Sequence, residues 1–496
     1  MGNIIPDKLT VPFPKKMNIE QTRIYVGSRR IKRKRFTGLL RQLVLVPGSD
    51  ASIIICPSNN PSLATLDKNS GKVFKQPVES PPYVTFEKDP AFCSIHSKGS
   101  LIYTEATMQL ELCNGHSYGL VRGGPERMDY IVDYDDIVTN NFTLSVEHFT
   151  IPDEGDFVAT ANYDDMISNM SHIYLWNQTL SKFVHFQSIK TQSAMMWKFF
   201  QIGYQYFLAV ANAGGVYVQH AVSVIYRWSY KEKKFIRHQI LTIMARSVEV
   251  FSIDMMYFLI VASKTEFGSG SSCTIIFKWS PDQSSFLFYN TLPTCGVLDL
   301  TFFRASIAPN LDGHCLAIAN ALGDTSSRVA SEIYCWEDSI AMFIHFQTIE
   351  TIGASDWEYF NFEDRYFLAV ANQVYQWSNE RDDSPVIEHE FALNSVIYEF
   401  DISLLRFVFY QRVETNGATD WEFFTIGNQR FLALANSNSS ISHIYRWRGV
   451  EKFVEVHRLP IGPTTDIDYI PINGEHYLAT ANHKGNRSKL LKIVTY

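Results

Sequence analysis

The sequence predicts an all-β protein built as a seven-bladed β-propeller. Three observations predict it: a hexapeptide that recurs seven times, four strand-like motifs in each repeat, and an abundance of aromatic residues. FLAVAN stands at 207–212 and again at 367–372, and the near-copies are FVATAN 157–162, FLIVAS 258–263, CLAIAN 315–320, FLALAN 431–436 and YLATAN 477–482. Their start-to-start spacing of 46 to 64 residues is typical of a repeat architecture.

Each repeat contains four strand-like segments. The hexapeptide is followed by a motif such as VIYRW 224–228 and then by one such as FIRHQIL 235–241, and it is preceded by one such as DWEYFNF 356–362. These segments are short, aromatic or β-branched, and bounded by Gly, Asn, Asp or Ser, which indicates strands. Seven four-stranded sheets favour a propeller. An open β-solenoid is the alternative, but its repeats are usually shorter.

The alternation within FLAVAN predicts how the blades pack. Phe207, Ala209 and Ala211 point to one side of the sheet, and Leu208, Val210 and Asn212 point to the other. The small alanines are expected to let the next blade approach closely near the axis. Because stacked blades bury what one blade cannot, the repeats should form one continuous ring.

The ring is expected to close through a strand from the beginning of the repeat region. The chain ends at Tyr496, before the seventh blade acquires a fourth strand. VDYDDIV (132–138) stands at the spacing where that strand is missing, and it is predicted to pair with KIVTY (492–496). This two-ended clasp would remove two exposed sheet edges.

Composition excludes several classes of protein. The chain of 496 residues is 46% hydrophobic, with a net charge of −7 and a pI of about 6.1, so it is neither a disordered polymer nor a nucleic-acid binder by charge. No apolar run approaches the roughly 18 residues of a membrane span, so membrane insertion is not expected. The first 20 residues lack an apolar signal core. They are interpreted either as the start of a cytosolic protein or as the truncated front of a secreted one.

The repeat unit is similar to a known family. Residues 395–436, SVIYEFDISLLRFVFYQRVETNGATDWEFFTIGNQRFLALAN, resemble the epilepsy-associated repeat, also called EAR or EPTP. Residues 36–66 resemble the closing strands of a thrombospondin-type laminin G domain. The resemblance implies the C-terminal part of a laminin G-like domain (1–75) and an EAR propeller (127–496), and the alternating pattern between them predicts a small two-cysteine β-hairpin module with a linker (76–126).

This resemblance implies a function. EAR propellers of the leucine-rich glioma-inactivated family bind membrane receptors of the disintegrin-metalloprotease type. A secreted or cell-surface scaffold that engages an extracellular receptor or matrix partner is therefore expected. The resemblance also implies Notch-linked epithelial, tooth and hair, or auditory development. The alternatives are a cytosolic interaction propeller and a glycan-acting propeller enzyme. No nucleophile elbow, H-E-x-x-H, P-loop or EF-hand motif occurs, so no catalytic residues are predicted.

Acidic residues recur in the strand that precedes each hexapeptide. The third position of that strand is acidic in six copies and Lys198 in the second; the acids are Glu147, Glu249, Asp299, Glu358, Glu422 and Asp468. The first position adds Asp356, Asp420 and Asp466. If this strand is innermost, the acids rim the central channel, where Ca²⁺ could neutralise them. The resemblance to the glioma-inactivated propellers also favours a channel cation. The alternative is that they accept hydrogen bonds from the backbone of neighbouring blades.

The seven cysteines suggest one disulfide. Cys93 and Cys113 lie near the two ends of the alternating segment 91–121, and their pairing would close a small hairpin module. Two free thiols are the alternative. Cys315 and Cys335 lie on adjacent strands of the fourth blade, where we expect buried apolar side chains rather than a bridge.

Surface features suggest modification and binding. The basic run RRIKRKR (Arg29–Arg35) is interpreted as a strand that binds heparan sulfate or as a solvated face, and a proprotein-convertase cleavage site is the alternative. Five Asn-x-Ser/Thr sequons are predicted to lie in loops and to carry glycans: Asn141, Asn169, Asn177, Asn438 and Asn486.

The longest loop that follows a hexapeptide is the candidate partner-binding element. Residues 373–395 contain Tyr375 and Trp377 beside an acidic stretch that includes Asp382 and Asp383. Exposed aromatic side chains next to charge are common at protein interfaces. A disordered insertion is the alternative interpretation.

Overall fold

The computed structural model describes two compact units, Met1–Val121 and Arg122–Tyr496. In the second unit it describes residues 126–495 except 140–141, 164–168, 215–219, 264–273, 295, 309–310, 322–325, 379–386 and 483–486. In the first unit it describes one antiparallel-rich sheet with the order β1-β2-β3-β4, in which β1 runs parallel to β2. These strands are β1 Val84–Thr85, β2 Leu101–Thr104, β3 Gln109–Cys113 and β4 Tyr118–Leu120.

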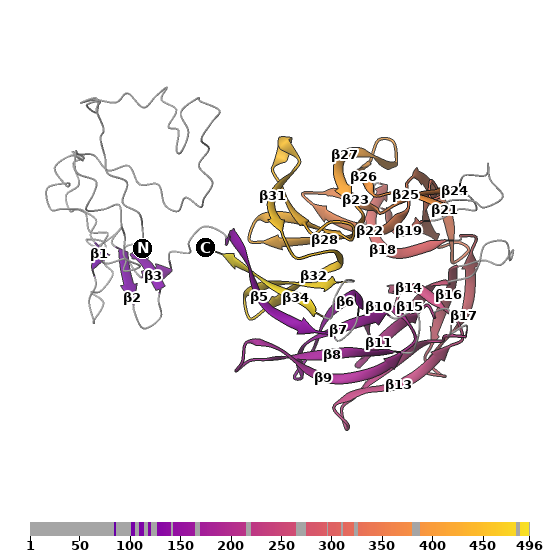
Figure 1. The fold of residues 1–496 in the computed structure, drawn as a ribbon, viewed down its shortest axis with the longest axis horizontal. Helices are drawn as coiled ribbons and strands as arrows, with labels where there is room; N and C mark the ends of the chain where they lie inside the picture. The colour runs from indigo at the N-terminus through magenta and orange to yellow at the C-terminus, as the bar shows by residue number, and fades with distance from the viewer. Residues whose placement is uncertain are drawn as a thin grey trace. The chain divides into compact units, whose positions relative to one another are not determined.

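Seven antiparallel four-stranded sheets form the propeller of the second unit (Figure 1). Blade 1 consists of β6 Phe142–Ile151, β7 Gly155–Tyr163, β8 Asn169–Asn177 and β9 Lys182–Thr191. Blade 2 consists of β10 Ala194–Ile202, β11 Gln205–Asn212, β12 Ser223–Ser229 and β13 Lys234–Leu241. Blade 3 consists of β14 Ala245–Ile253, β15 Met256–Ser263, β16 Thr274–Ser280 and β17 Ser285–Leu292. Blade 4 consists of β18 Val297–Ala308, β19 Leu311–Asn320, β20 Ala330–Glu337 and β21 Met342–Glu350. Blade 5 consists of β22 Ala354–Phe362, β23 Arg365–Asn372, β26 Ala392–Asp401 and β27 Arg406–Asn416. Blade 6 consists of β28 Ala418–Ile426, β29 Gln429–Asn436, β30 Ser442–Trp447 and β31 Phe453–Leu459.

Blade 7 combines the two ends of the propeller. Its strands are β32 Thr464–Ile472, β33 Glu475–Asn482, β34 Arg487–Thr495 and β5 Met128–Val138. Two further strands, β24 Tyr375–Ser378 and β25 Ile387–Glu390, form a hairpin outside the blades. Among the described residues, all regular secondary structure is β-strand except for one 3₁₀ turn at Gly449–Glu451.

The first strand of every blade lies at the axis. These seven strands contact one another around the ring, in the order β6, β10, β14, β18, β22, β28, β32 and back to β6. The FLAVAN strand is the second in each blade, as the sequence predicts. The Phe and Ala side chains of β11 pack with the next blade, whereas Leu208 and Val210 pack with the previous one. Both faces of each sheet are therefore covered.

Aromatic side chains on the inner strands fill the wedges between blades. Phe251 of blade 3 stacks on Phe302 of blade 4, with ring centroids 4.2 Å apart. Phe360 stacks on Phe423 in the same way at 4.7 Å. Offset stacking of this kind adds to the free energy of burial. The abundance of Phe and Tyr in the sequence thus follows from the need to fill each blade interface.

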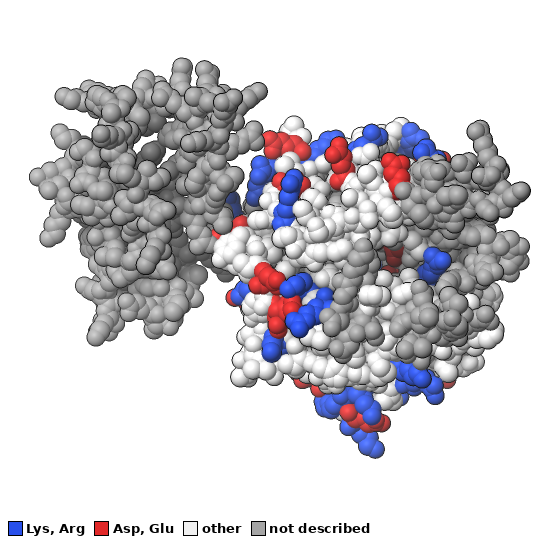
Figure 2. All heavy atoms as spheres, viewed as in Figure 1, with Lys and Arg blue, Asp and Glu red and all other residues white. Residues whose placement is uncertain are grey.

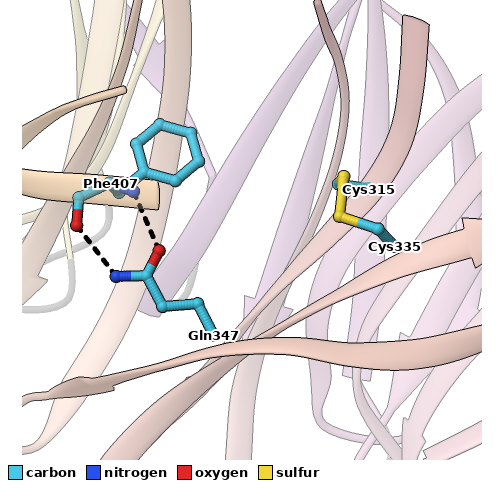
Figure 3. The surroundings of a disulfide bond; sticks show 4 residues. All are labelled: Cys315, Cys335, Gln347 and Phe407. Carbon is cyan, nitrogen blue, oxygen red and sulfur yellow. Dashed lines mark hydrogen bonds between the residues drawn. A yellow bond between two sulfur atoms is a disulfide. The ribbon is translucent and has the colours of Figure 1, made fainter. Parts of the chain in front are cut away.

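A glutamine joins the outer strands of successive blades. The side chain of Gln347 on β21 donates to the carbonyl of Phe407 on β27 at 2.8 Å and accepts from its amide at 2.9 Å (Figure 3). Gln187, Gln239 and Gln411 make the same two bonds to the next blade. The outer rim of the ring is therefore linked by paired hydrogen bonds as well as by packing.

The predicted clasp is confirmed, but its register differs. Residues 132–138 of β5 pair with 487–492 of β34, not with 492–496 (Figure 1). In the other blades the residue opposite the first residue of the hexapeptide belongs to the IYxW motif, and in blade 7 that residue is Lys492, opposite Tyr477. The third strand of blade 7 therefore centres on KLLKI (489–493). Its weak resemblance to IYxW explains the error.

Charge pairing agrees with this register. Lys489 lies 2.9 Å from Asp133 and 2.6 Å from Asp136, and Arg487 lies 2.9 Å from Asp136. Figure 2 shows a mixed cluster of acidic and basic side chains over β5 and β34. An acidic strand from the start of the propeller thus meets a basic strand from its end.

Candidate functional sites

The acidic residues of the inner strands lie where the sequence predicts, on the strands that surround the axis. The backbone amide groups of the adjacent blades explain why so many acidic residues occur there. An innermost strand is a sheet edge, so every second amide group faces the adjacent blade without a partner in its own sheet. Carboxylates of that adjacent blade supply the missing acceptors, which supports the structural alternative for these residues.

The pattern repeats with both acidic positions. Glu358 accepts from the amide of Phe423 at 2.9 Å, and Asp356 accepts from that of Trp421 at 2.9 Å. The same kind of bond joins further pairs, given as acceptor and amide donor: Glu422 and Tyr469 at 3.1 Å, Asp420 and Ile467 at 2.9 Å, Asp468 and His148 at 2.5 Å, Asp466 and Val146 at 2.7 Å, Glu147 and Phe199 at 2.7 Å, and Asp299 and Trp357 at 3.5 Å.

Burial and mutual repulsion raise the pKa of these carboxyl groups. Burial raises the pKa of Glu358 to about 8 and that of Glu147 to about 7. Burial also raises the pKa of Asp356, and repulsion by Asp299 and Glu358 adds to it. The pKa of Asp420, Glu422 and Asp468 is likewise raised well above the ordinary value, first by burial and then by neighbouring carboxylates. The inner ring therefore favours protons or another source of positive charge.

One source is Lys198. Its ammonium group lies 2.7 Å from the carboxylate of Glu249. Burial alone would lower the pKa of Lys198, but attraction to Glu249 and Glu147 raises it. Blades 1 to 3 thus contain a fixed cation. The sector of blades 5 to 7 contains six carboxylates at the first and third positions and no lysine at either.

The described geometry does not by itself form a metal cage. Within the part of the chain that the structure describes, no three His, Cys, Asp or Glu side chains are grouped as a metal site requires. The backbone hydrogen bonds to Glu358, Glu422 and their neighbours occupy one oxygen of each carboxylate. Ca²⁺ in the channel stays a prediction.

A buried polar cluster at the base of the loops was missed from the sequence. The side chain of Asn372, the last residue of FLAVAN in blade 5, accepts from the amide of Ile352 at 3.2 Å and donates to the carbonyl of Asn394 at 2.7 Å. Its own amide donates to Ser395, whose hydroxyl lies 3.2 Å from that of Thr415. Ser171–Thr191 and Ser331–Thr351 repeat the hydroxyl pair at the same spacing of 20 residues. That constant spacing is a sequence signal.

The candidate partner-binding loop contains a hairpin on this base. Tyr375 and Trp377 lie on β24, which pairs with β25, so the described part of the loop is ordered as strands. Asp382 and Asp383 lie outside the described residues. The hydroxyl of Ser327 donates to the carbonyl of Val374 at 2.8 Å, and the amide of Gly417 donates to the carbonyl of Phe391 at 2.9 Å. Both stems of the hairpin are therefore attached to neighbouring loops.

A glycine lets one stem come close. Gly353 adopts φ of +55°, and a Cβ placed on it would lie 2.2 Å from the carbonyl oxygen of Val374. No other residue type fits this contact without a shift of the backbone. Gly353 also accepts from the amide of Gln373 at 3.0 Å. The sequence predicts a long loop here, but it indicates neither the hairpin nor the glycine that supports it.

The prediction that Cys315 and Cys335 are unbridged is wrong. They form a disulfide between β19 and β20, shown in Figure 3. The two residues stand directly opposite each other in the antiparallel register, with Cα atoms 4.0 Å apart, so their side chains leave the same face together. Cys113 is also in a disulfide. Cys93 lies outside the described residues, so the Cys93–Cys113 pairing stays a prediction.

The sequons are less uniform than predicted. Asn169 lies in β8 and is 7% exposed, which is incompatible with its predicted place in a loop and leaves little room for a glycan. Asn177 ends the same strand, and Asn438 is exposed in a loop of blade 6. Asn141 and Asn486 lie outside the described residues, as does the basic run Arg29–Arg35. Glycosylation stays a prediction.

No helix among the described residues is long and apolar enough to cross a membrane. The EPTP domain family matches residues 182–229, 234–280, 342–401 and 406–448. Each match begins with the outer strand of one blade and continues through the first three strands of the next. The sequence repeat is therefore offset from the blade by one strand, which is why the ring must close with β5.

Two curated relatives match nearly the whole chain. Thrombospondin-type laminin G domain and EAR repeat-containing protein of Homo sapiens is 37% identical over 91% of this chain and 67% of its own length. The Mus musculus protein of the same name is 36% identical over the same shares. Leucine-rich repeat LGI family member 2 of Homo sapiens is 26% identical over 42% of this chain and 36% of its own length.

The likeness to solved structures is weaker. A periplasmic gluconolactonase of Pseudomonas aeruginosa matches 65% of this chain and 86% of its own length, with 13% identity and a TM-score of 0.46. The identity to the two mammalian relatives and the EPTP matches agree with the seven-bladed architecture. The chain therefore belongs to the family of thrombospondin-type laminin G domain and EAR repeat-containing proteins.

Proposed function

We propose that this chain is a secreted or cell-surface scaffold whose propeller binds an extracellular receptor or matrix protein. The observation that carries the proposal is the β24–β25 hairpin, which stands on a ring closed by β5 and is attached at both stems. Loops on a rigid scaffold are where recognition usually resides, because the scaffold bears the entropy cost of positioning them. A place in Notch-linked epithelial or auditory development is the finer part of the proposal.

The extracellular location is supported by the disulfide chemistry. Cys315–Cys335 and the disulfide of Cys113 are bonds that persist in oxidising compartments and are rare in the cytosol. This favours secretion over a cytosolic interaction propeller. Expression in secreting cells, followed by thiol labelling of the intact and reduced protein, tests it. Free thiols at Cys315 and Cys335 in the secreted protein would contradict it.

A glycan-acting enzyme is disfavoured by the channel. A glycosidase needs two carboxyl groups that face the substrate, one as acid and the other as base or nucleophile. Here the acids that line the axis accept hydrogen bonds from neighbouring blades, as with Glu358 and Glu422. They are tied to ring closure rather than held free for proton transfer.

The binding role is tested by removing the hairpin alone. Residues 375–390 are replaced with a short Gly-Ser linker, which keeps Val374 and Phe391 and their hydrogen bonds. Because Tyr375 pairs directly with Glu390, two linker residues bridge the stems. We expect the variant to be secreted with an unchanged circular dichroism spectrum and to lose binding to receptor-bearing cells.

The matched control replaces residues 215–219, which stand between β11 and β12 in the sequence as 375–390 stand between β23 and β26, with the same linker. We expect this control to bind cells like the wild-type protein. Full binding by the hairpin variant would overturn the assignment of recognition to this loop. Equal loss in both variants would point to the whole face rather than to the hairpin.

A further inference from the structure

Exposed apolar side chains are concentrated on the outer rim of blades 3 to 5. Of the twenty large hydrophobic side chains that are exposed among the described residues, nine lie in the segments 281–292, 337–350 and 401–412. The largest exposures there are those of Phe288 at 68% and Phe409 at 58%. We call these three segments the apolar rim. Each consists of the turn after the third strand and all or most of the outer strand that follows it.

Contacts between blades make the rim continuous. The phenolic oxygen of Tyr289, next to Phe288, donates to the carbonyl of Ala341 at 2.6 Å, which brings the blade 3 segment to that of blade 4. The paired hydrogen bonds of Gln347 with Phe407 bring the blade 4 segment to that of blade 5. Ile340, Ile344 and Leu404 are the other prominent exposed members.

Comparison with equivalent positions distinguishes blades 3 and 5 from the others. The residue opposite the Tyr or Phe of the third strand is His185, Arg237, His345 and Glu455 in blades 1, 2, 4 and 6. In blades 3 and 5 it is Phe288 and Phe409. A charged side chain normally protects an edge strand from association. Blades 3 and 5 present an exposed aromatic ring there instead.

The outer segments of these blades also differ in charge from those of blades 1 and 2. The segments of blades 3 and 4 contain four acids and no lysine or arginine; the acids are Asp282, Glu337, Asp338 and Glu350. The equivalent segments of blades 1 and 2, 177–191 and 229–241, contain six basic residues and one acid. Blade 5 adds Asp401 together with Arg406 and Arg412. The apolar rim is thus bordered by negative charge over two of its three blades.

We propose that the apolar rim is a second interaction surface, which takes a partner protein segment that alternates apolar with lysine or arginine side chains. Aromatic anchors that fill pockets and a charged border are the common composition of interfaces, and opposite charge steers the encounter. The turns of the rim lie on the face opposite the loop that carries β24–β25, because strands alternate in direction. The surface therefore acts independently of the hairpin.

A labelled peptide of alternating lysine and leucine or phenylalanine tests this by fluorescence anisotropy against the whole protein. The triple variant Phe288→Ser, Ile344→Ser, Phe409→Ser removes three anchors whose side chains are exposed, so the fold should survive. We expect its affinity for the peptide to fall about tenfold or more. The matched control, Tyr204→Ser with Val450→Ser, removes exposed apolar side chains elsewhere and should bind like the wild type.

Charge is tested separately. The double variant Asp282→Lys, Asp338→Lys should have a lower affinity for the lysine peptide than the wild type. The same peptide with glutamate in place of lysine should not bind the wild type. Equal binding of both peptides, or equal loss in the Tyr204 and Val450 control, would overturn the proposal. Self-association of the wild type that disappears in the triple variant would assign the rim to a second copy of the chain and would also overturn it.

Discussion

Replacement of Glu147 by glutamine should stabilise the propeller at high pH and not at low pH. The carboxyl group accepts from the amide of Phe199 at 2.7 Å, and glutamine keeps an oxygen for that bond. Burial raises the pKa of Glu147 from 4.5 to about 7. The folded protein therefore retains a proton that the unfolded chain loses, and stability falls as pH rises from about 4.5 through about 7.

The size of the effect follows from that difference. The difference between a pKa of 4.5 in the unfolded chain and about 7 in the folded protein corresponds to about 3 kcal/mol of lost stability, which is fully developed above pH 7 and largely absent near pH 5. Urea unfolding followed by tryptophan fluorescence at pH 5, 6, 7 and 8 measures it, with wild type and Glu147→Gln compared at each pH. We expect the variant to gain about 2 to 3 kcal/mol relative to wild type across this series.

The control is Glu414→Gln, an exposed carboxylate on the outer strand β27. Its difference from wild type should be within about 0.5 kcal/mol at every pH. A Glu147→Gln advantage that is constant with pH would refute the reasoning, because the proton would then play no part. An advantage that grows toward pH 5 would show that the sign is wrong.

Three further changes test the frame of the ring. Cys315→Ala with Cys335→Ala should lower the free energy of unfolding by about 3 kcal/mol, the effect expected for a loop of this length, and reducing agent should destabilise the variant less than the wild type, because only the disulfide of Cys113 remains to be reduced. Lys489→Glu should lower the melting temperature by repelling Asp133 and Asp136, and adding Asp136→Lys should restore part of it; no recovery would mean that charge does not stabilise the clasp. Asn372→Leu should cost about 2 to 3 kcal/mol by leaving the amide of Ile352 and the carbonyl of Asn394 unpaired, whereas exposed Asn428→Leu should be nearly neutral in the same urea titration.

Local patterns made the fold predictable, and long-range geometry limited the rest. FLAVAN and IYxW repeat in every blade or nearly so, because each must fill the same wedge. The clasp was found from spacing alone, but its register was wrong because KLLKI lacks the aromatic residues of IYxW. The Cys315–Cys335 bridge depends on which residues stand opposite across a loop of variable length, which the sequence does not specify.

The channel illustrates the same limit. The recurrence of acids at the third position marks a structural rule, and the sequence left open whether that rule concerns a cation or the backbone. The bonds from Glu358 to Phe423 and from Asp356 to Trp421 favour the backbone, because they satisfy amide groups that the edge strand leaves unpaired. Only the positions of the neighbouring blades could decide this.

Both edges of a blade receive side chains from the preceding blade, the acids at the axis and the glutamine at the outer rim. At the axis, acids accept from the edge amides. At the outside, the fourth strand contains a β-bulge opposite the third strand in blades 1 to 6, as between Ile173 and Tyr174. Bulges make an edge a poor template for further pairing. The bulged residue of blade 1, Phe186, stacks on Trp228 of blade 2 at 5.9 Å.

This explains why the sequence repeat is offset from the blade. The bulged aromatic residue and the Gln of one blade contact the third and fourth strands of the next, so the outer strand and the following three strands form one coupled unit. The EPTP matches have this same frame. A ring of such units closes without a special end, because β5 and the strands of blade 1 form the first unit. The exposed loops and the outer rim are thereby left free to differ between blades, and both proposed binding surfaces lie there.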